Sequence, residues 1–376
     1  MNIRIPLALL ALAACASEPP APPVNGTKAA RELALDSIPI RTWGEAEGMQ
    51  LSVVSGMAFV GEDRVVVADG TAGTVTLLSL GDDTARRLGR TGSGPGEYRR
   101  PEVLGTTDDG RIMMRDMQQF RIIAWNADGS LHGTTGPGAK REGVIWSPAA
   151  VTGSGTLVTT AAAYGVPGVA GSLRRIEATV VIADEAGRAI TPLGSFPYAD
   201  FISLYLPGDG GQMIQGPQYF GWKLHVAAAR DVIAVGSADR AVISMFRANG
   251  DSIGRIQLPT DRLAVTPAMR DAFIARARAQ AQDRITPVSL APERFADSLP
   301  YFGALVVTRG GTVWVVAPFW AGHSPPTMTG YTLAGERRGT LALPRHFMPL
   351  AATDSLVAGY LLDENEVPTI AVYRFR

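Results

Sequence analysis

Aromatic side chains gather in the long, irregular segments of this sequence, where they could form a binding site. Segment 196–222 is rich in Phe, Tyr and Trp, and segment 317–327 contains Phe319, Trp320 and His323. Aromatic rings bury apolar ligand surface and stack on sugars or peptides. The alternative is that the rings only pack these segments onto the rest of the fold. We predict ligand-binding residues as follows: Trp146, Tyr219, Trp222, Trp320 and His323.

The short motifs that mark common catalytic and metal sites are missing from the sequence. It contains no Gly-x-Ser-x-Gly, no His-Glu-x-x-His and no complete calcium loop. The acidic run at residues 363–366 lacks the turn glycine of a calcium loop, which favours a solvated loop. The chain has only 4 His residues, and His132 is expected on a different face from the others. We therefore predict no catalytic residue, no metal and no cofactor.

The N-terminus has the pattern of an export and anchoring signal. A positive start, Met-Asn-Ile-Arg, precedes an apolar run at residues 5–14 that is too short to span a bilayer. Residues 12–15, Leu-Ala-Ala-Cys, resemble the lipobox of bacterial lipoproteins, which implies cleavage before Cys15 and acylation of its thiol. Ala rather than Asp at position 16 then implies sorting to the outer membrane. The alternative is an ordinary signal peptide with a chance cysteine.

Three segments follow from this reading of the chain. Residues 1–14 form the signal peptide, and residues 15–33 form the lipidated Cys15 with a Pro-rich tether that should be extended. Residues 34–376 form the folded domain. Because Cys15 is the only cysteine, an internal disulfide and a thiolate zinc site are excluded.

The charge balance argues against a nucleic-acid partner. The chain carries 35 basic and 35 acidic residues, and only 19% of its residues are charged. Such a composition produces no strong positive field of the kind that binds nucleic acid. The 42 Gly and 26 Pro residues, set among apolar runs, indicate many short strands joined by turns.

A turn followed by an apolar strand recurs six times along the body of the chain. Each turn is polar and contains Gly, Asp or both, which suits tight hairpins. The residues directly before the six apolar strands are Arg64, Arg111, Thr156, Asp231, Thr312 and Ser355. Three of the intervals between them match a four-stranded propeller blade of about 40–50 residues, and two are longer.

A second type of turn falls at a constant phase after the first, in the segments 125–129, 182–187, 246–250 and 331–335. Two phased turns in six units predict an all-β fold, a six-bladed β-propeller. The last unit lacks a fourth strand, and residues 37–43 at the other end of the chain offer a spare one. Pairing the two would close the ring and cover two strand edges. The alternatives are a β-sandwich or two small β-domains.

One segment carries a resemblance to a known group of proteins. Residues 89–98 read Gly-Arg-Thr-Gly-Ser-Gly-Pro-Gly-Glu-Tyr and are followed by Pro101. This resembles the inter-blade segment of bacterial six-bladed β-propeller lipoproteins, relatives of the NHL-repeat propellers. The resemblance implies a fold and a place in the cell envelope rather than an activity. A phosphate-binding role for the glycines is the alternative, although no Lys-Ser/Thr follows and no helix begins there.

The long segments of the chain fall on one face of the predicted propeller, which we call the long-loop face. It is formed by the second-to-third strand loops and the links between blades, and a scaffold carries its binding site on such a face. One helix is expected at about 266–283, capped by Thr266, as a lid, a side brace or a simply packed helix.

We therefore expect a membrane-tethered lipoprotein, anchored through Cys15 in the cell envelope and most simply at the outer membrane. It would bind an envelope protein, a peptide or a glycan on its long-loop face. The alternative is a hydrolase or lyase, lactonase-like or metal-dependent, that uses the same face.

Overall fold

The protein is described by a computed structural model that covers residues 31–136, 140–141, 144–163, 165, 168–205, 213–281, 290–318 and 326–376. The predicted signal peptide, Cys15 and most of the tether lie outside the described residues, as do Trp320 and His323. No described helix is long and apolar enough to cross a membrane.

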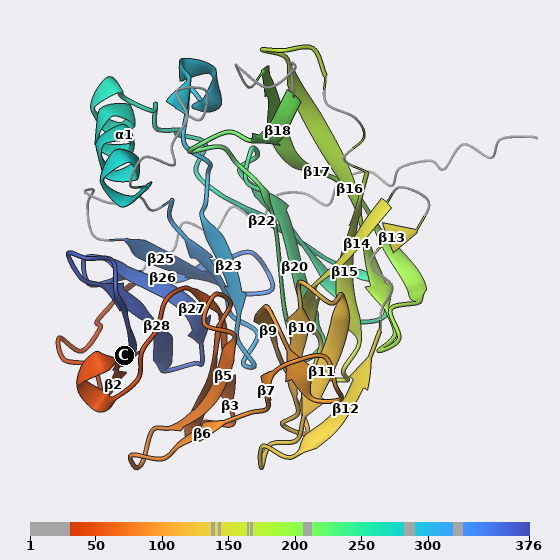
Figure 1. Cartoon of the computed structure of the whole chain (residues 1–376), viewed down its shortest axis with the longest axis vertical. Helices are drawn as coiled ribbons and strands as arrows, with labels where there is room; N and C mark the ends of the chain where they lie inside the picture. Colours follow the sequence, from red (N-terminus) through yellow and green to blue (C-terminus); the bar gives the residue numbers. More distant parts are fainter. Residues whose placement is uncertain are drawn as a thin grey trace, which may run out of the picture.

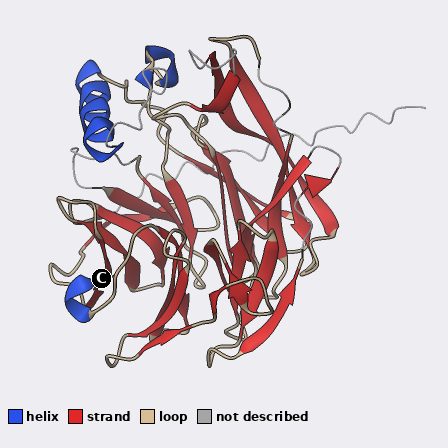
Figure 2. Cartoon of the chain, in the orientation of Figure 1, coloured by secondary structure: helices blue, strands red, loops and turns tan. Residues whose placement is uncertain are grey.

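The described strands form six mainly antiparallel sheets of at least four strands each, and one two-stranded parallel sheet of β7 (Arg90–Thr91) and β8 (Glu97–Tyr98). Figures 1 and 2 show how the sheets are arranged. The first strands of the sheets are β3 (Val54–Val60), β9 (Pro101–Thr106), β14 (Val144–Val151), β19 (Leu224–Ala229), β23 (Ala304–Val307) and β27 (Phe347–Ala352). Each first strand contacts the next in this order, and β27 contacts β3. The sheets therefore close into a ring around the first strands, which confirms the prediction of an all-β propeller.

In each sheet the second and third strands are arranged in chain order from the first strand, at the centre of the ring, toward the outer edge. The second strands are β4 (Arg64–Asp69), β10 (Ile112–Asp116), β15 (Leu157–Ala162), β20 (Val232–Ser237), β24 (Val313–Val316) and β28 (Leu356–Leu362). The third strands are β5 (Thr74–Ser79), β11 (Arg121–Trp125), β16 (Leu173–Ala183), β21 (Val242–Arg247), β25 (Thr327–Tyr331) and β29 (Pro368–Arg374). The outer strands are β6 (Ala85–Arg87), β12 (Leu131–Thr135), β17 (Ala189–Tyr205), β22 (Ser252–Gln257) and β26 (Arg337–Ala342). Short strands β13 (Lys140–Arg141) and β18 (Met213–Pro217) extend the third sheet.

The repeat read from the sequence has the correct register. Each of the six residues predicted to precede an apolar strand lies at the start of a second strand or one residue before it. The second type of turn joins the third strand to the fourth in four sheets, as expected. Side chains of neighbouring sheets pack against each other in apolar clusters, for example Val66 and Leu77 of the first sheet with Ile112 and Ile123 of the second.

The N-terminal residues close the ring as predicted. Strand β2 (Arg41–Trp43) pairs with β29 and supplies the fourth strand of the last sheet, and Trp43 is buried. Strand β1 (Arg31–Leu33) was expected to belong to the tether. It instead pairs in parallel with β26 on the fifth sheet. The outer edges of two sheets are thus covered by residues near the N-terminus.

Two buried aspartates fix the loops at the ends of second strands. The Asp116 carboxylate accepts hydrogen bonds from the backbone N–H groups of Gln118 and Gln119 in the following loop, at 2.9 and 3.2 Å. It also accepts from Arg99 and Arg100, which precede β9, at 2.9 and 3.2 Å. Asp69 occupies the same place in the first sheet and likewise accepts from four backbone N–H groups. Each carboxylate therefore ties a loop to the link between blades.

The Gly-rich segment 89–98 is a structural link between the first and second sheets. Gly89 has a φ of 64°, and a Cβ there would collide with the Gly96 carbonyl oxygen. The Glu97 carboxylate accepts hydrogen bonds from the N–H groups of Ser93 and Gly94 at 2.9 and 2.8 Å, and these bonds lower the pKa of Glu97. Buried Tyr98 hydrogen-bonds across to the first sheet. Since Glu97 occupies the N–H groups that a phosphate would need, the structural reading of this segment is favoured.

Candidate functional site

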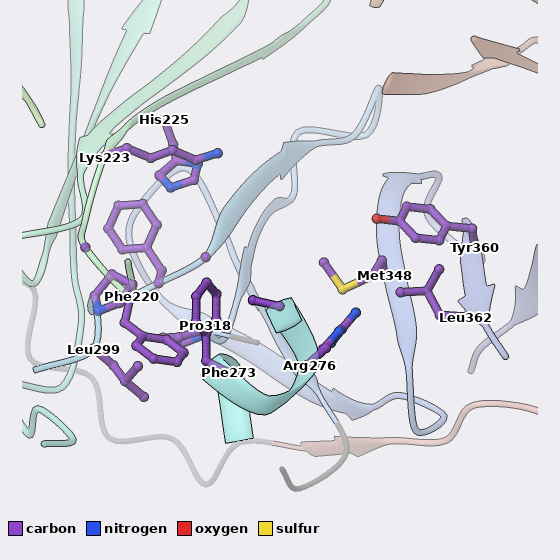
Figure 3. Close-up of a pocket in the computed structure, with 15 residues that line it drawn as sticks. Phe220, Lys223, His225, Phe273, Arg276, Leu299, Pro318, Met348, Tyr360 and Leu362 are labelled. Atoms are coloured by element: carbon purple, nitrogen blue, oxygen red, sulfur yellow. The ribbon is translucent and has the colours of Figure 1, made fainter. Parts of the chain in front are cut away.

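A pocket of about 550 Å³ lies on the long-loop face, beneath helix α1 (Pro267–Ala281) (Figure 3). Five separate parts of the chain line it: the link into β19 and its start, helix α1, the link before β23, Pro318 after β24, and strands β27 and β28 of the last sheet. Its volume lies within the range usual for small-molecule sites. The helix predicted at 266–283 is therefore confirmed in position, and it forms one wall of the pocket.

Helix α1 is held over the ring at two points. Thr266 caps its N-terminus, with its hydroxyl accepting a hydrogen bond from the Met269 N–H at 3.3 Å. Phe273 packs against Tyr219, with ring centroids 4.4 Å apart, and edge-on to Phe295 at 5.5 Å. Further along, Arg276 forms an ion pair with Glu366 in the loop between β28 and β29. The helix thus spans from the link before β19 to the last sheet.

The backbone before β19 turns sharply at the pocket wall. Phe220 has a φ of 56°, a left-handed conformation that costs a non-glycine residue about 1–3 kcal/mol. This turn places Phe220 in the pocket wall and against Phe273, with ring centroids 5.6 Å apart. Strained backbone of this kind is common at ligand sites, where surrounding packing holds it.

The pocket wall is mainly apolar and contains a small set of polar side chains. Its apolar members include Phe220, Phe273, Leu299, Phe302, Met348 and Leu362. The polar groups are Lys223, His225, Arg276 and Tyr360. In Figure 3 the Tyr360 hydroxyl points into the pocket toward Met348, and Lys223 lies beside His225. Apolar walls with a few convergent polar groups are typical of a site that orients a small ligand.

His225 is a neutral imidazole at physiological pH. Burial, and in addition the nearby positive charge of Lys223, lower the pKa of His225 to about 3. Its ring lies 5.3 Å from the Phe302 ring, centroid to centroid. Burial also raises the pKa of the Tyr360 phenol, which therefore stays protonated. Both side chains offer hydrogen bonds to a ligand without carrying charge.

His225 also lines the central channel of the ring, a cavity of about 680 Å³ enclosed by the first strands. Polar groups join the sheets at its far end, on the short-turn face. There Arg309 donates a hydrogen bond to the Thr107 carbonyl oxygen of the second sheet. Asp108 lies 3.7 Å from Arg230 and 3.8 Å from Arg309, in ion pairs between three sheets. The pocket beneath α1 is therefore the mouth of the channel on the long-loop face.

Three of the five predicted ligand-binding residues, Trp146, Tyr219 and Trp222, belong to the described part of the chain. Trp222 is 6% exposed; its indole N–H donates to Asp200 at 2.9 Å, and the Arg175 guanidinium lies 4.8 Å from its ring centroid. Tyr219 is half-buried among the rings that hold α1, and Trp146 is half-buried on β14. None of these three lines the pocket beneath α1. Trp320 and His323 lie outside the described residues, so their role stays a prediction.

The pocket residues that the sequence did not single out come from three distant parts of the chain. In the sequence His225 is one of three histidines expected on the same face, and no motif marks Lys223, Arg276, Met348 or Tyr360. One signal was available, because the predicted inner strand begins beside Trp222. Residues at the start of an inner strand lie near the mouth of a propeller channel, and Lys223 directly precedes β19 while His225 is its second residue.

Comparison with known proteins found solved structures that resemble this chain in shape at low sequence identity. No protein family and no curated protein matches the sequence. A protein described as exported, from Bacteroides fragilis, is similar in structure with a TM-score of 0.49 and 10% identity, over 92% of this chain and 95% of that one. A gluconolactonase from Xanthomonas campestris has a TM-score of 0.42 and 14% identity, over 93% and 99% of the two chains. The β-propeller domain of Cps50 from Myceliophteria thermophila has a TM-score of 0.42 and 11% identity, over 91% and 99%. At this distance the similarity does not extend to substrates or partners.

Proposed function

We propose that this chain is a lipid-anchored β-propeller of the cell envelope that binds a small amphipathic ligand in the pocket beneath α1. The observation that carries the proposal is the pocket itself, about 550 Å³ in volume, with apolar walls and four polar side chains. The fourth, fifth and sixth sheets and the links beside them supply its walls, and a helix held by aromatic packing and an ion pair covers it. The anchor at Cys15 and the outer-membrane address are part of the proposal and are supported by the sequence of residues 1–16.

Binding explains the polar groups of the pocket better than catalysis does. A general base works best when its pKa lies near the operating pH, and the pKa of His225, about 3, is far below that. Among the residues that the structure describes, no three His, Cys, Asp or Glu side chains are grouped so as to hold a metal ion. Uncharged His225 and Tyr360 are instead suited to orient a bound molecule by hydrogen bonding.

Filling the pocket from the helix is expected to abolish binding. Ala277 lines the pocket, and an Ala277→Trp substitution would place an indole ring in the space that a ligand needs. Dansyl-phenylalanine, whose fluorescence rises in apolar surroundings, should bind the wild-type chain saturably with one site. Affinity should fall at least about tenfold in the variant, since the ligand loses most of its contact area.

Ala275→Trp is the matched control, because Ala275 lies on the same helix but is exposed and does not line the pocket. This variant should bind the probe as wild type does. Equal binding by Ala277→Trp and wild type would place the probe elsewhere and contradict the proposed site.

The anchor is tested by a Cys15→Ser substitution. A hydroxyl cannot replace the thiol in acyl transfer, so the variant should move from the membrane pellet to the supernatant after cell fractionation. Binding of dansyl-phenylalanine should be unchanged, because the described lining of the pocket comes from residues 220–362. A variant that still sediments with membranes after a salt wash would contradict lipid anchoring.

A further inference from the structure

Lys223 is an unusual residue for this chain, which contains 3 lysines among 35 basic residues. Arginine makes the ion pairs found among the described residues, where its planar group suits carboxylate partners. Lys223 is exposed at the mouth of the pocket and forms no ion pair with another described residue. A compact, free ammonium group therefore stands beside neutral His225.

The other cation of the pocket is already neutralised. Arg276 is paired with Glu366, which is held in the loop between β28 and β29 with a φ of 65°. No acidic side chain belongs to the described lining of the pocket. The described lining of the pocket therefore has one unpaired positive charge, the Lys223 ammonium, which lies beside His225.

Two neutral hydrogen-bonding groups face the same space. His225 and Tyr360 form no hydrogen bond with another described side chain, although both line the pocket. An imidazole N–H and a phenol O–H can each donate to an anionic oxygen, and such charge-assisted bonds are about twice as strong as neutral ones. The described lining of the pocket thus supplies hydrogen-bond donors and a free ammonium group, and no carboxylate belongs to that described lining.

We infer that the ligand is an amphipathic small molecule with a single anionic group, which binds the Lys223 ammonium and the His225 imidazole beside it. Its apolar part lies among Phe220, Phe273 and Met348. This inference rests on the proposed function, because it names the ligand class of the same pocket. On this inference, the polar end of the ligand is negatively charged and Lys223 binds this charge.

The test compares two probes that differ only in charge. Dansyl-phenylalanine carries a carboxylate, and dansyl-phenylalanine amide has the same rings without it. The acid should bind wild-type protein about tenfold more tightly than the amide, as one charge-assisted contact predicts. Lys223→Met should remove this preference, so that acid and amide bind the variant with equal affinity, because the variant has no ammonium group to hold the carboxylate.

A second pair of variants tests whether the Glu366 carboxylate, which is paired with Arg276, opposes binding of an anionic ligand. Glu366→Gln removes the negative charge beside Arg276, so it should raise the preference for the acid over the amide about threefold. Glu364→Gln makes the same charge change in the same loop, but Glu364 is exposed and does not line the pocket. It should alter neither affinity.

The scarcity of lysines allows a direct readout as well. An amine-acetylating reagent can modify only Lys28, Lys140, Lys223 and the N-terminal amine. Saturating dansyl-phenylalanine should slow acetylation of Lys223, read by peptide mass spectrometry, while Lys140 reacts at an unchanged rate.

The outcomes separate the two proposals. Equal affinity for acid and amide in wild type, or a preference that survives in Lys223→Met, would overturn the inference while the pocket stands. Failure of both probes to bind would instead overturn the proposed function.

Discussion

Replacing Asp116 by alanine is expected to destabilise the protein by about 3–5 kcal/mol. The carboxylate is buried, and it accepts hydrogen bonds from four backbone N–H groups in two segments. Alanine would leave these partly buried donors without their shared acceptor and would detach the loop after β10 from the link before β9. Equilibrium unfolding in urea, followed by tryptophan fluorescence, measures the change in the free energy of unfolding.

Asp128→Ala is the control for that measurement. Asp128 is an exposed turn residue whose carboxylate accepts from the Ser130 N–H at 2.9 Å, within a single hairpin. Its loss should change the unfolding midpoint only slightly. A similar small change for Asp116→Ala would mean that the aspartates do not hold the blades together.

Removal of the closing strand is expected to have a still larger effect. Deleting residues 16–43 eliminates β2, which pairs with β29, and β1, which pairs with β26. The loss of buried Trp43 alone should cost about 3–5 kcal/mol, and the exposed strand edges add to it. Deleting residues 16–30 should leave the melting temperature unchanged, since neither strand is touched.

Melting of the two truncated chains by circular dichroism is the comparison to make. If the longer deletion prevents folding, Trp43→Ala provides the same test at a smaller scale. Equal melting temperatures for all three variants and the wild type would contradict closure of the ring by the N-terminal strand.

The fold could be predicted from the sequence because propeller sheets are built from local hairpins. Turn residues and alternating strands lie next to each other in the chain, so the six copies and their phase were visible, down to the start of β4 at Arg64. Closure of the ring by β2 could also be predicted, because the last repeat unit lacks a fourth strand and residues 37–43 predict an additional strand near the N-terminus. Pairing of β1 with β26 was not, because Arg31–Leu33 has no strand pattern and its partner is about 300 residues away.

The pocket was harder to predict because it depends on side-chain direction. Counting aromatic residues selected Trp222, whose ring is covered by Arg175, and passed over neighbouring Phe220. The difference between them arises from the left-handed turn at Phe220, which the sequence does not reveal. Met348 and Tyr360 join the site only through closure of the ring, more than 120 residues from His225.

A crystal structure of the protein with dansyl-phenylalanine bound tests the central claim most directly. The proposed site predicts the naphthalene ring beneath α1, in contact with Phe220, Phe273 and Met348, and the carboxylate within hydrogen-bond distance of Lys223. A second cavity, of about 470 Å³, lies between the third and fourth sheets and is lined by Arg240 and Arg255. A probe bound in that cavity, with the space beneath α1 unoccupied, would contradict the account.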